Sequence, residues 1–399
     1  MGPDGRIGIL TDPPRHAPGN AAALTEPVET NLTSLPTPLL TTPEQLAAAC
    51  DHWRKAPWLA LDTEFLREDT YYPKLCLIQI GDGSDNICID AVALPGEALR
   101  PLLEMLQAAD SAKVFHAASQ DLEIFVQLQG RTPQPLFDSQ VAAALLGYGD
   151  QLGYAALVEK LLGIKLDKSL TRTDWSRRPL NAAELAYAAD DVRYLGEIYP
   201  RLRQELVDRG RLHWLEEDCL RLADPARYRN PPEAAWRRLK GLARLAPPAQ
   251  RAAAALAAWR ERVAQERNRP RKWIVDDDVV YRLAERRPSD RAQLEGLQLL
   301  PPKTLERHAD ALLQVIAAAA GDSAPLALEE APLDDTQKSR LKQLLERLRT
   351  LGETLGVPPS LLAPRGDVET LLRHGGAAEV PLLRGWRREA AGEELLRML

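Results

Sequence analysis

The sequence predicts an α/β domain followed by two all-helical modules. Short apolar runs bounded by turn residues, which are typical of strands, gather in the first half of the chain. Beyond residue 230 these runs disappear, and alanine, leucine, arginine and glutamate dominate between proline pairs at 231–232, 247–248 and 301–302. A chain of 399 residues is also too long for one ordinary domain.

Four apolar runs predict the strands of the first domain, at 58–61, 75–80, 87–92 and 113–116. The first three follow one another closely and are separated by turn residues such as those at 81–83. We therefore expect a meander, within an α/β domain between about residues 37 and 210 whose sheet is mostly antiparallel.

Helical spacing of apolar residues follows the strands, at 119–128, 138–146 and 154–162. A longer helix is expected to begin at Asn181 and to run to Asp208. Asn181 is a suitable N-cap because Glu184, three positions further on, can complete a capping box. Pro200 is expected to break this helix.

Composition excludes several classes of protein. No apolar run approaches the roughly 20 residues that a membrane helix needs, so we expect no membrane association. The four cysteines lie far apart without a CxxC pair, which argues against a disulfide scaffold or a structural zinc site. The N-terminus lacks the pattern of a secretory signal, and we expect a cytoplasmic protein.

Charge is distributed unevenly, although the whole chain carries a formal net charge of only −6. Acidic residues outnumber basic ones between Thr37 and Pro200, whereas basic residues outnumber acidic ones between Trp236 and Asp290. This asymmetry fits metal-dependent chemistry in the first part and binding of a polyanion in the second. A solvated helix surface explains the basic segment equally well.

The two helical modules share a pattern where a loop meets a helix. The segment Arg269–Val279 places a proline, an apolar pair and an aspartate ahead of a helix. The segment Pro358–Val368 does the same at an offset of 89 residues. We therefore expect an internal repeat, with chance similarity between two such junctions as the alternative.

Two carboxylates follow the first predicted strand. Asp62 and Glu64 lie two residues apart, and alternation along a strand points both side chains to the same face. Like charges in this arrangement repel one another unless a cation lies between them. An ordinary cap at the end of a strand is the alternative interpretation.

Further acidic residues stand at the ends of other predicted elements. Asp121 lies in the first turn of the helix that follows the fourth strand. Tyr187 and Asp191 are one helical turn apart and project from the same face of their helix. With Asp62 and Glu64, these aspartates supply the hard oxygen ligands that Mg²⁺ or Mn²⁺ prefers, and two such ions can cleave a phosphodiester bond.

These motifs resemble those of the ribonuclease D family, within the DEDD superfamily of 3′–5′ exonucleases. The resemblance covers roughly residues 37–399. Its three motifs occur in the family's order, at Leu61–Phe65, His116–Leu122 and Tyr187–Asp191. The flanking segments Thr70–Pro73 and Asp174–Leu180 agree as well. The helical modules resemble HRDC domains, of which the second is a diverged example.

The resemblance implies a ribonuclease H-like fold and two divalent metal ions, Mg²⁺ or Mn²⁺. Their ligands, which also count as catalytic residues, would be Asp62, Glu64, Asp121 and Asp191. Tyr187 would be a fifth catalytic residue that orients or helps to deprotonate the attacking water. A sister subclass has a histidine five residues before the last aspartate, where this chain has Ala186, so the tyrosine (DEDDy) subclass is implied.

By matching position, four residues are candidates for the pocket that holds the RNA 3′ end: Phe65, Gln79, His116 and Arg178, the last as a phosphate contact. Core packing and structural hydrogen bonds are the alternatives for the first three. Basic residues beside Trp259 and Trp273 could supply phosphate contacts and base stacking. They are Arg260, Arg262, Arg267, Arg269, Arg271 and Lys272.

With this resemblance, the chain divides into six expected segments. They are a flexible Pro-rich leader (1–36), a DEDDy exonuclease domain (37–210), a linker (211–232), an HRDC domain (233–320), a second linker (321–335) and a second, diverged HRDC-like domain (336–399).

The expected function is a 3′–5′ exoribonuclease that removes nucleotides stepwise from RNA 3′ ends and releases nucleoside 5′-monophosphates. The resemblance implies tRNA 3′ maturation and processing of small stable RNAs, with tRNA precursors carrying 3′ trailers as substrates. It also implies a monomer without an obligate protein partner. A DNA exonuclease and a catalytically dead nucleic-acid-binding scaffold are the competing hypotheses; all four carboxylates are present, which disfavours the scaffold.

Overall fold

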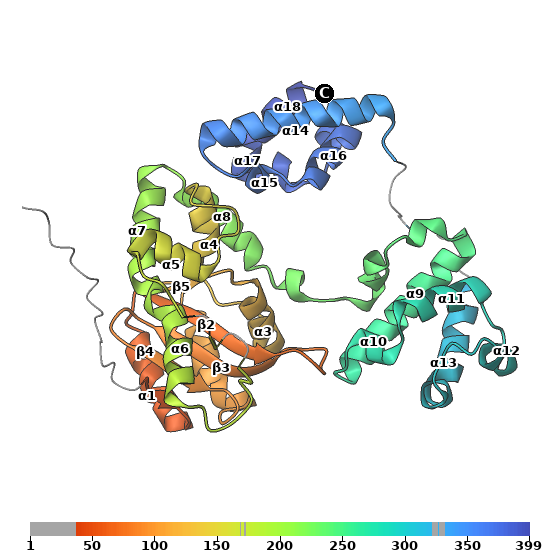
Figure 1. Cartoon of the computed structure of the whole chain (residues 1–399), viewed down its shortest axis with the longest axis horizontal. Coiled ribbons are helices and arrows are strands. Elements are labelled where there is room, and N and C mark those ends of the chain that lie inside the picture. Colours follow the sequence, from red (N-terminus) through yellow and green to blue (C-terminus); the bar gives the residue numbers. More distant parts are fainter. Residues whose placement is uncertain (1–36, 168, 171–172, 321–325, 327–331) are drawn as a thin grey trace, which may run out of the picture. The chain divides into compact units, whose positions relative to one another are not determined.

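The structure is a computed structural model of the chain (Figure 1). It describes residues 37–167, 169–170, 173–320, 326 and 332–399. The leader predicted at 1–36 and most of the linker predicted at 321–335 lie outside the described residues. The described part of the chain belongs to one compact unit.

A six-stranded sheet forms the centre of the first domain, with the strand order β1-β4-β3-β2-β5-β6. The strands are β1 (Leu39–Leu40), β2 (Trp58–Leu66), β3 (Lys74–Gly81), β4 (Asn86–Asp90), β5 (Ala112–Phe115) and β6 (Leu136–Asp138). The four predicted apolar runs all become strands. The two outermost strands, β1 and β6, are too short to give a periodic signal in the sequence.

The sheet is mixed, and the expectation of a mostly antiparallel sheet was wrong. The strands β2, β3 and β4 form the predicted antiparallel meander. However, β5 pairs with β2 in parallel, β6 pairs with β5 in parallel, and β1 pairs with β4 in parallel. The reason lies in the connections, because helical segments separate β4 from β5 and β5 from β6 and return the chain in the same direction.

Helices cover both faces of this sheet (Figure 1). They are α1 (Pro43–Trp53), the 3₁₀ turn η1 (Gly96–Leu99), α2 (Arg100–Met105), α3 (Ser119–Gln129), α4 (Ser139–Leu145), α5 (Tyr154–Leu162), α6 (Ala182–Arg193), α7 (Leu195–Asp208) and α8 (Leu212–Leu222). Leu59 and Leu61 of β2 pack in one core with residues of α1, α2 and α3. Ala60, on the other face of β2, packs with residues of α4, α5, α6 and α7. Alternation along β2 therefore decides which face receives each side chain.

The helix that carries the third motif begins where the sequence predicts. The Asn181 side chain accepts a hydrogen bond from the backbone N–H of Glu184, and the Glu184 carboxylate accepts one from the N–H of Asn181. This capping box fixes the first turn of α6. The predicted break at Pro200 was wrong: the chain changes from α6 to α7 at Tyr194, and Pro200 lies inside α7, in its second turn.

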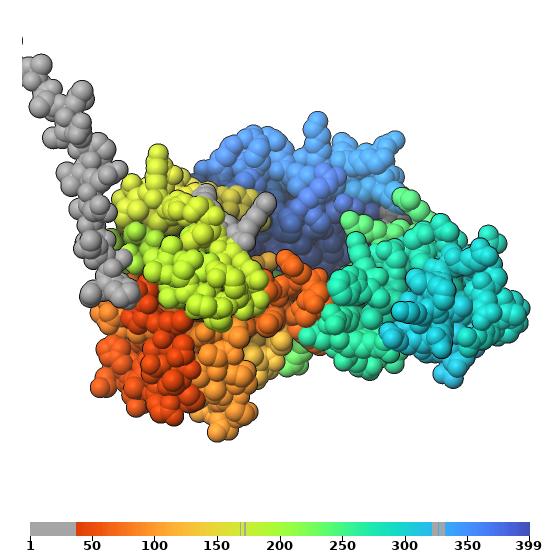
Figure 2. Space-filling view, turned by 60° about the horizontal axis from the view of Figure 1, so that its bottom comes forward, coloured from red at the N-terminus to blue at the C-terminus, as the bar shows by residue number. Residues whose placement is uncertain are grey.

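Beyond α8, the regular elements of the described residues are all helical. Short 3₁₀ segments follow α8, at η2 (Pro225–Tyr228), η3 (Pro232–Arg238) and η4 (Leu242–Arg244). The first helical region contains α9 (Pro247–Glu266), α10 (Arg271–Ile274), α11 (Asp277–Arg286), α12 (Arg291–Gly296) and α13 (Pro302–Ala320). The second contains α14 (Asp335–Leu355), α15 (Pro359–Leu362), α16 (Arg365–His374), η5 (Gly375–Ala377), η6 (Pro381–Leu383), α17 (Gly385–Arg387), the π-helical turn η7 (Arg388–Gly392) and α18 (Glu393–Arg397). Figure 2 shows the first region in green to cyan and the second in blue.

The segment 211–232, which we expected as a linker, contains the helix α8. Leu215 and Cys219 of this helix are buried in the core that also contains residues of α7. The boundaries of the domains remain predictions. Among the described residues, none of the helices combines the length and apolar character needed to cross a membrane.

The two helical regions repeat one backbone pattern. The short helices α10 and α15 and the following helices α11 and α16 correspond at an offset of 88 residues, one less than the sequence pattern indicated. The residue after the short helix is extended in both copies, with φ −155° and ψ 133° at Val275 and φ −158° and ψ 135° at Ala363. At this offset Trp273 corresponds to Leu361, and Asn268 corresponds to Gly356. Both of the latter residues have positive φ.

Candidate active site

Strand β2 presents two carboxylates on one face of the sheet. Asp62 pairs with Gln79 of β3, and Glu64 pairs with Leu77, so these four side chains share a face. A bulge follows between Glu64 and Phe65 and ends the regular alternation. The arrangement of Asp62 and Glu64 is the one that their spacing predicts.

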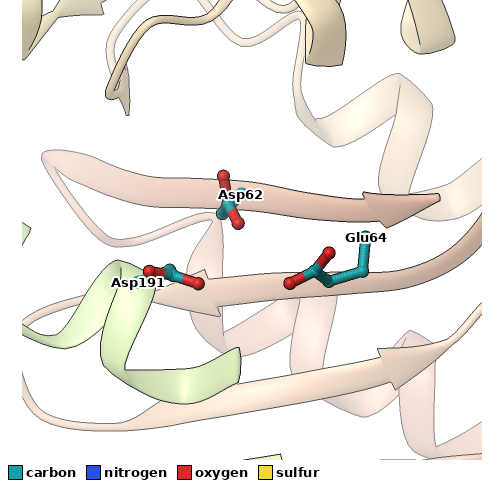
Figure 3. Close-up of side chains that lie close together, drawn as sticks. All are labelled: Asp62, Glu64 and Asp191. Atoms are coloured by element: carbon teal, nitrogen blue, oxygen red, sulfur yellow. The ribbon is translucent and has the colours of Figure 1, made fainter. Parts of the chain in front are cut away.

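Helix α6 brings a third carboxylate to the same face. Its inner surface is fixed by the buried residues Ala188, Ala189 and Val192, which places Asp191 above β2. One carboxylate oxygen from each of Asp62, Glu64 and Asp191 can be chosen so that all three lie within 4.8 Å of one another. Figure 3 shows these three side chains, two from β2 and one from α6. A group of this size and ligand chemistry can hold a hard divalent cation.

Asp121 approaches from the opposite side of the sheet and lies outside that three-residue group. It is in the first turn of α3, whose residues Leu122 and Phe125 pack against the other face. The hydroxyl of Thr63, which alternation points away from Asp62 and Glu64, donates a hydrogen bond to Asp121. Asp121 is buried.

Asp138, to which the sequence assigned no functional role, holds the turn that leads into α3. The buried Asp138 carboxylate accepts hydrogen bonds from the backbone N–H groups of Ala117 and Ala118, at 3.2 and 2.9 Å. Ala117 has a φ of 58°, an uncommon conformation for a residue with a side chain. Asp138 therefore secures the geometry between β5 and Asp121. Its position at the start of a predicted helix was visible in the sequence, but its partners in the tertiary structure were not.

The environment of the site raises the pKa values of its four carboxyl groups and so favours their protonated forms in the metal-free protein. Burial raises the pKa of Glu64 to about 8, and repulsion by Asp191 and Asp121 adds to this shift. Burial also raises the pKa of Asp191 to about 7 and that of Asp121 to about 7. Burial and the three neighbouring carboxylates raise the pKa of Asp62 well above its usual range. A bound cation would relieve this repulsion and favour the ionised forms.

Tyr187 and Asp191 lie one turn apart on α6 and line the same pocket. The pocket has a volume of about 490 Å³ and also receives Tyr154, Leu166 and Asp190. The ring of Tyr187 stacks on Trp175, with 6.2 Å between ring centroids and 27° between ring planes. The pocket therefore adjoins the acidic group through Asp191, and it is large enough to receive part of a nucleotide.

Two further candidates carry polar atoms that have no partner within the described part of the chain. Gln79 is fully buried, and neither its amide oxygen nor its amide nitrogen is hydrogen-bonded. The Nδ1 atom of His116 lies 2.9 Å from the hydroxyl of Ser139, whereas its buried Nε2 atom is unpaired. Phe65 is half-buried at the bulge of β2. Unpaired buried polar groups are rare, so these atoms are candidates for hydrogen bonds to a ligand.

The Arg178 side chain is fully hydrogen-bonded within the fold. Its guanidinium forms two hydrogen bonds of 2.6 Å to the Asp90 carboxylate. Its other donors reach the backbone carbonyl oxygens of Trp175, Arg177 and Cys76. Every N–H of the side chain therefore has an acceptor within the protein, which disfavours the predicted phosphate contact.

The basic segment of the first helical region also divides into structural and exposed residues. Trp259 and Arg260 are buried, and Arg271 is bound to the buried Glu261. Trp273, in contrast, is exposed. The other basic residues of the predicted set lie on the surface: Arg262, Arg267, Arg269 and Lys272.

Comparison with known proteins gives the class to which this fold and site belong. The family described as 3′–5′ exonuclease matches residues 39–207, and the HRDC domain family matches residues 249–316. The first match contains the sheet and all four carboxylates. The fold and the acidic site therefore define a ribonuclease H-like 3′–5′ exonuclease domain, followed by a helical HRDC region.

Relatives similar along most of the chain narrow this class. Ribonuclease D of Sphingobium indicum is 40% identical over 368 residues, covering 90% of this chain and 93% of the relative. Ribonuclease D of Acidiphilium cryptum is 42% identical over 375 residues, covering 92% and 94%. The chain belongs to the ribonuclease D family, and it is a 3′–5′ exoribonuclease that hydrolyses phosphodiester bonds in RNA.

Solved structures agree with this assignment. The crystal structure of Escherichia coli RNase D, an exoribonuclease involved in structured RNA processing, has a TM-score of 0.81 and 32% sequence identity. The match covers 92% of the present chain and 99% of the Escherichia coli chain. The catalytic core of RRP6 from Trypanosoma brucei has a TM-score of 0.57 at 22% identity, which shows a shared fold.

Proposed function

We propose that this exoribonuclease shortens RNA from the 3′ end by two-metal-ion hydrolysis and releases nucleoside 5′-monophosphates. The observation that carries the proposal is the group of Asp62, Glu64 and Asp191, whose oxygens approach within 4.8 Å, on a fold of the 3′–5′ exonuclease family. Asp121 is the proposed fourth carboxylate. Its hydrogen bond from Thr63 ties it to the strand that carries the first two.

The donor set fits hard divalent cations because every proposed ligand is a carboxylate oxygen. Two ions, Mg²⁺ or Mn²⁺, would supply Lewis-acid activation of a water molecule and stabilisation of the leaving oxygen. Asp62, Glu64, Asp121 and Asp191 would hold these ions. To do so, the carboxyl groups must lose the protons that their raised pKa values favour in the metal-free protein.

Tyr187 is proposed to hold the attacking water through its phenolic oxygen. It lines the pocket beside Asp191, one helical turn away, and Trp175 supports its ring. Phe65, Gln79 and His116 are proposed to bind the terminal nucleotide, because the last two carry buried polar atoms without a protein partner among the described residues. Stacking on an aromatic ring and hydrogen bonds to a base or sugar are the usual means of holding a single-stranded end.

We propose tRNA precursors with 3′ trailers and other small stable RNAs as the natural substrates. The ribonuclease D family supports this proposal, as does the role of the Escherichia coli relative in structured RNA processing. We further propose a cytoplasmic monomer without an obligate protein partner. Sedimentation of the purified chain tests the monomer, and a sedimenting mass twice that of the chain would contradict it.

The decisive experiment is a time course on matched RNA and DNA oligomers labelled at the 5′ end, with Mn²⁺, Mg²⁺ or a chelator. The proposal expects stepwise shortening of the RNA, its abolition by the chelator and release of 5′-monophosphates. Equal digestion of both strands would favour a general exonuclease and remove the tRNA assignment. Binding without digestion in any metal would favour the nucleic-acid-binding scaffold.

Variants connect this activity to the proposed residues. Asp62→Asn and Asp191→Asn are expected to reduce the rate by at least about a thousandfold while RNA binding persists, because electrostatic stabilisation of the transition state is lost. Glu197→Gln is the control, since Glu197 is an exposed carboxylate on the neighbouring helix α7 and lies outside the pocket and the acidic group. It should keep activity within a few-fold of the wild type. Full activity of either test variant would overturn the site assignment.

A further inference from the structure

The first helical region presents an exposed tryptophan on a short, well-anchored turn. Trp273 lies in α10 and leaves 61% of its surface exposed, whereas Trp53, Trp175, Trp259 and Trp386 are buried. Large aromatic side chains seldom stay in water when they only serve stability, because burial of their surface is strongly favourable. The exposure of Trp273 therefore indicates either a binding role or a position that the fold leaves open to solvent.

The backbone that carries Trp273 is held on both sides. Ile274 and Val275, which follow it, are buried, and the Val275 carbonyl accepts a hydrogen bond of 3.0 Å from the buried Arg260. Arg271, which precedes it, donates two hydrogen bonds of 2.6 and 2.7 Å to the Glu261 carboxylate. With its neighbours fixed inward, the turn directs Trp273 outward in a defined position.

The internal repeat shows what the equivalent turn does elsewhere in this molecule. At the offset of 88 residues, Ser360 and Leu361 stand where the first region has Lys272 and Trp273. Ser360 donates a hydrogen bond of 2.7 Å to Asp150 of the exonuclease domain, and Leu361 packs partly buried against the core that this domain contributes to. The second copy of the turn is thus a docking surface. The first copy has the same backbone, but its outer residue is exposed.

The charges around Trp273 indicate the chemistry of the ligand that this residue would bind. The guanidinium of Arg269 lies 5.7 Å from the centre of the Trp273 ring. Within the described ranges, the exposed Arg267 and Lys272 have no carboxylate partner. The nearby acids are already engaged, because Asp276 caps α11, Asp277 pairs with Arg260, and Asp278 pairs with Arg282.

We propose that Trp273, with Arg269 and Lys272, is a stacking platform for single-stranded RNA upstream of the 3′ end that enters the active site. The aromatic face would stack on a base and Lys272 would contact the adjacent phosphates, whereas Arg269, which is paired with Asp69, would hold the ring in position. This inference rests on the proposed function, since it names where that function's substrate continues beyond the site.

The platform is joined to the hairpin that follows the catalytic strand. The Arg269 guanidinium reaches Asp69 at 3.0 Å to its carbonyl and 3.3 Å to its carboxylate. The Asn268 side chain accepts hydrogen bonds of 3.0 Å from the N–H groups of both Tyr71 and Tyr72. From Glu64 to Asp69 an extended chain spans at most roughly 17 Å. At about 3.4 Å per nucleotide, a stacked RNA strand covers a span of that length with about five nucleotides.

The test compares binding of two RNAs to the full chain, with a chelator present so that neither is hydrolysed. One is an unstructured 20-nucleotide RNA and the other a trinucleotide that is too short to reach the platform. Trp273→Ala should weaken binding of the long RNA by about tenfold, the usual effect of losing one stacked base. Its effect on the trinucleotide should be absent, and Trp273→Phe should restore most of the affinity for the long RNA.

Leu220→Ala is the matched control, because Leu220 is a similarly exposed apolar residue (68%) on α8, outside the basic segment. It should bind both RNAs as the wild type does. Unchanged affinity of Trp273→Ala for the long RNA would overturn the platform, and so would an equal loss for both RNAs. Failure of the chain to hydrolyse RNA would contradict the proposed function. Because binding is measured without metal, the comparison of the two RNAs could still be interpreted in that case.

Discussion

Arg178 and Asp90 form a two-pronged ion pair that ties the loop before α6 to the end of β4. Both hydrogen bonds measure 2.6 Å, and the Asp90 side chain is only 5% exposed. Burial is the largest single influence and raises the pKa of Asp90, but the hydrogen bonds and charge of Arg178, together with the backbone N–H groups of Val92 and Ala93, outweigh it and lower the pKa. The pair fixes the position from which α6 starts, and α6 carries Tyr187 and Asp191.

Arg178→Ala should therefore act on stability first. Removing one partner leaves the Asp90 carboxylate buried without its charge partner, and we expect a loss of about 3 kcal/mol in the free energy of unfolding. Because the pKa of Asp90 is lowered in the folded state, this stabilisation is present above about pH 4 and is lost on further acidification. Urea unfolding at pH 7 measures the change.

Arg177→Ala is the control for the Arg178 variant. The side chain of Arg177 is 51% exposed, and its buried partner Glu184 keeps the hydrogen bond from the Asn181 N–H, so removal of Arg177 should cost less than removal of Arg178. A phosphate contact would give the opposite pattern for Arg178→Ala. Its stability would match the wild type, and its KM for RNA would rise.

The local parts of the site could be predicted from the sequence because each depends on short-range geometry. The spacing of Asp62 and Glu64 sets a shared face in any strand, and the spacing of Tyr187 and Asp191 sets a shared face in any helix. The capping box at Asn181 is likewise a local signal. These local features do not depend on the surrounding fold.

The parts that the sequence does not reveal depend on partners far away in the chain. Arg178 was predicted as a phosphate contact because nothing nearby reveals Asp90, which lies 88 residues away in the chain. The parallel pairing of β5 and β6 follows from helical crossovers, and a strand of three residues such as β6 has no periodicity to detect. Asp138 was seen only as a helix start, although its carboxylate also holds the turn before Asp121.

Stability of the metal-free protein should fall as the pH rises from about 5 to 8. The folded state raises the pKa of Glu64 to about 8 and that of Asp191 to about 7, above the values of about 4 in an unfolded chain. The folded state therefore binds more protons in this window, and ionisation there favours unfolding. Thermal denaturation in chelator should show this decline, and Mn²⁺ should reverse it.

Asp191→Asn should raise the stability of the metal-free protein at pH 8, by roughly 2 kcal/mol, because it removes one of the repelling charges. The same substitution should weaken the stabilisation by Mn²⁺. Glu197→Gln serves as the control, because Glu197 is an exposed carboxylate on the neighbouring helix α7, outside the acidic group. A melting temperature that is independent of pH in chelator would contradict the electrostatic account of the site.

Tyr187→Phe should reduce kcat by about a hundredfold or more and leave KM for RNA nearly unchanged. The phenylalanine ring can still pack on Trp175, so the pocket keeps its shape while the hydroxyl that holds the water is lost. Mn²⁺ binding, measured by calorimetry, should match that of the wild type. Tyr154→Phe offers a contrast, since the Tyr154 hydroxyl donates to the Asp190 carbonyl and its loss should lower stability rather than kcat.

Asp218→Ala should detach the second helical region from α8. The buried Asp218 carboxylate accepts hydrogen bonds from the Arg387 guanidinium and, at 3.1 Å, from the Trp386 indole. Its removal leaves the guanidinium buried and unpaired, which should cost about 3 kcal/mol. Urea unfolding should then separate into two transitions. Glu216→Ala, at an exposed position of the same helix, should unfold as the wild type does.

Gln79→Leu should stabilise the metal-free protein and impair hydrolysis. The Gln79 side chain is fully buried beside Asp62, and neither of its polar atoms has a partner among the described residues. Replacing an unsatisfied amide by an apolar group of similar size should raise the free energy of unfolding by about 1 kcal/mol. Loss of a hydrogen bond to the terminal nucleotide should lower kcat/KM for RNA by about tenfold.

Ser111→Ala separates these two effects for Gln79. The Ser111 hydroxyl is also buried without a partner in the described part of the chain, but it precedes β5 at the end of the sheet remote from the carboxylates. Its removal should change stability in the same direction while kcat/KM stays at the wild-type value. If Gln79→Leu behaved like this control, with higher stability and full activity, Gln79 would be a buried polar residue without a part in binding RNA.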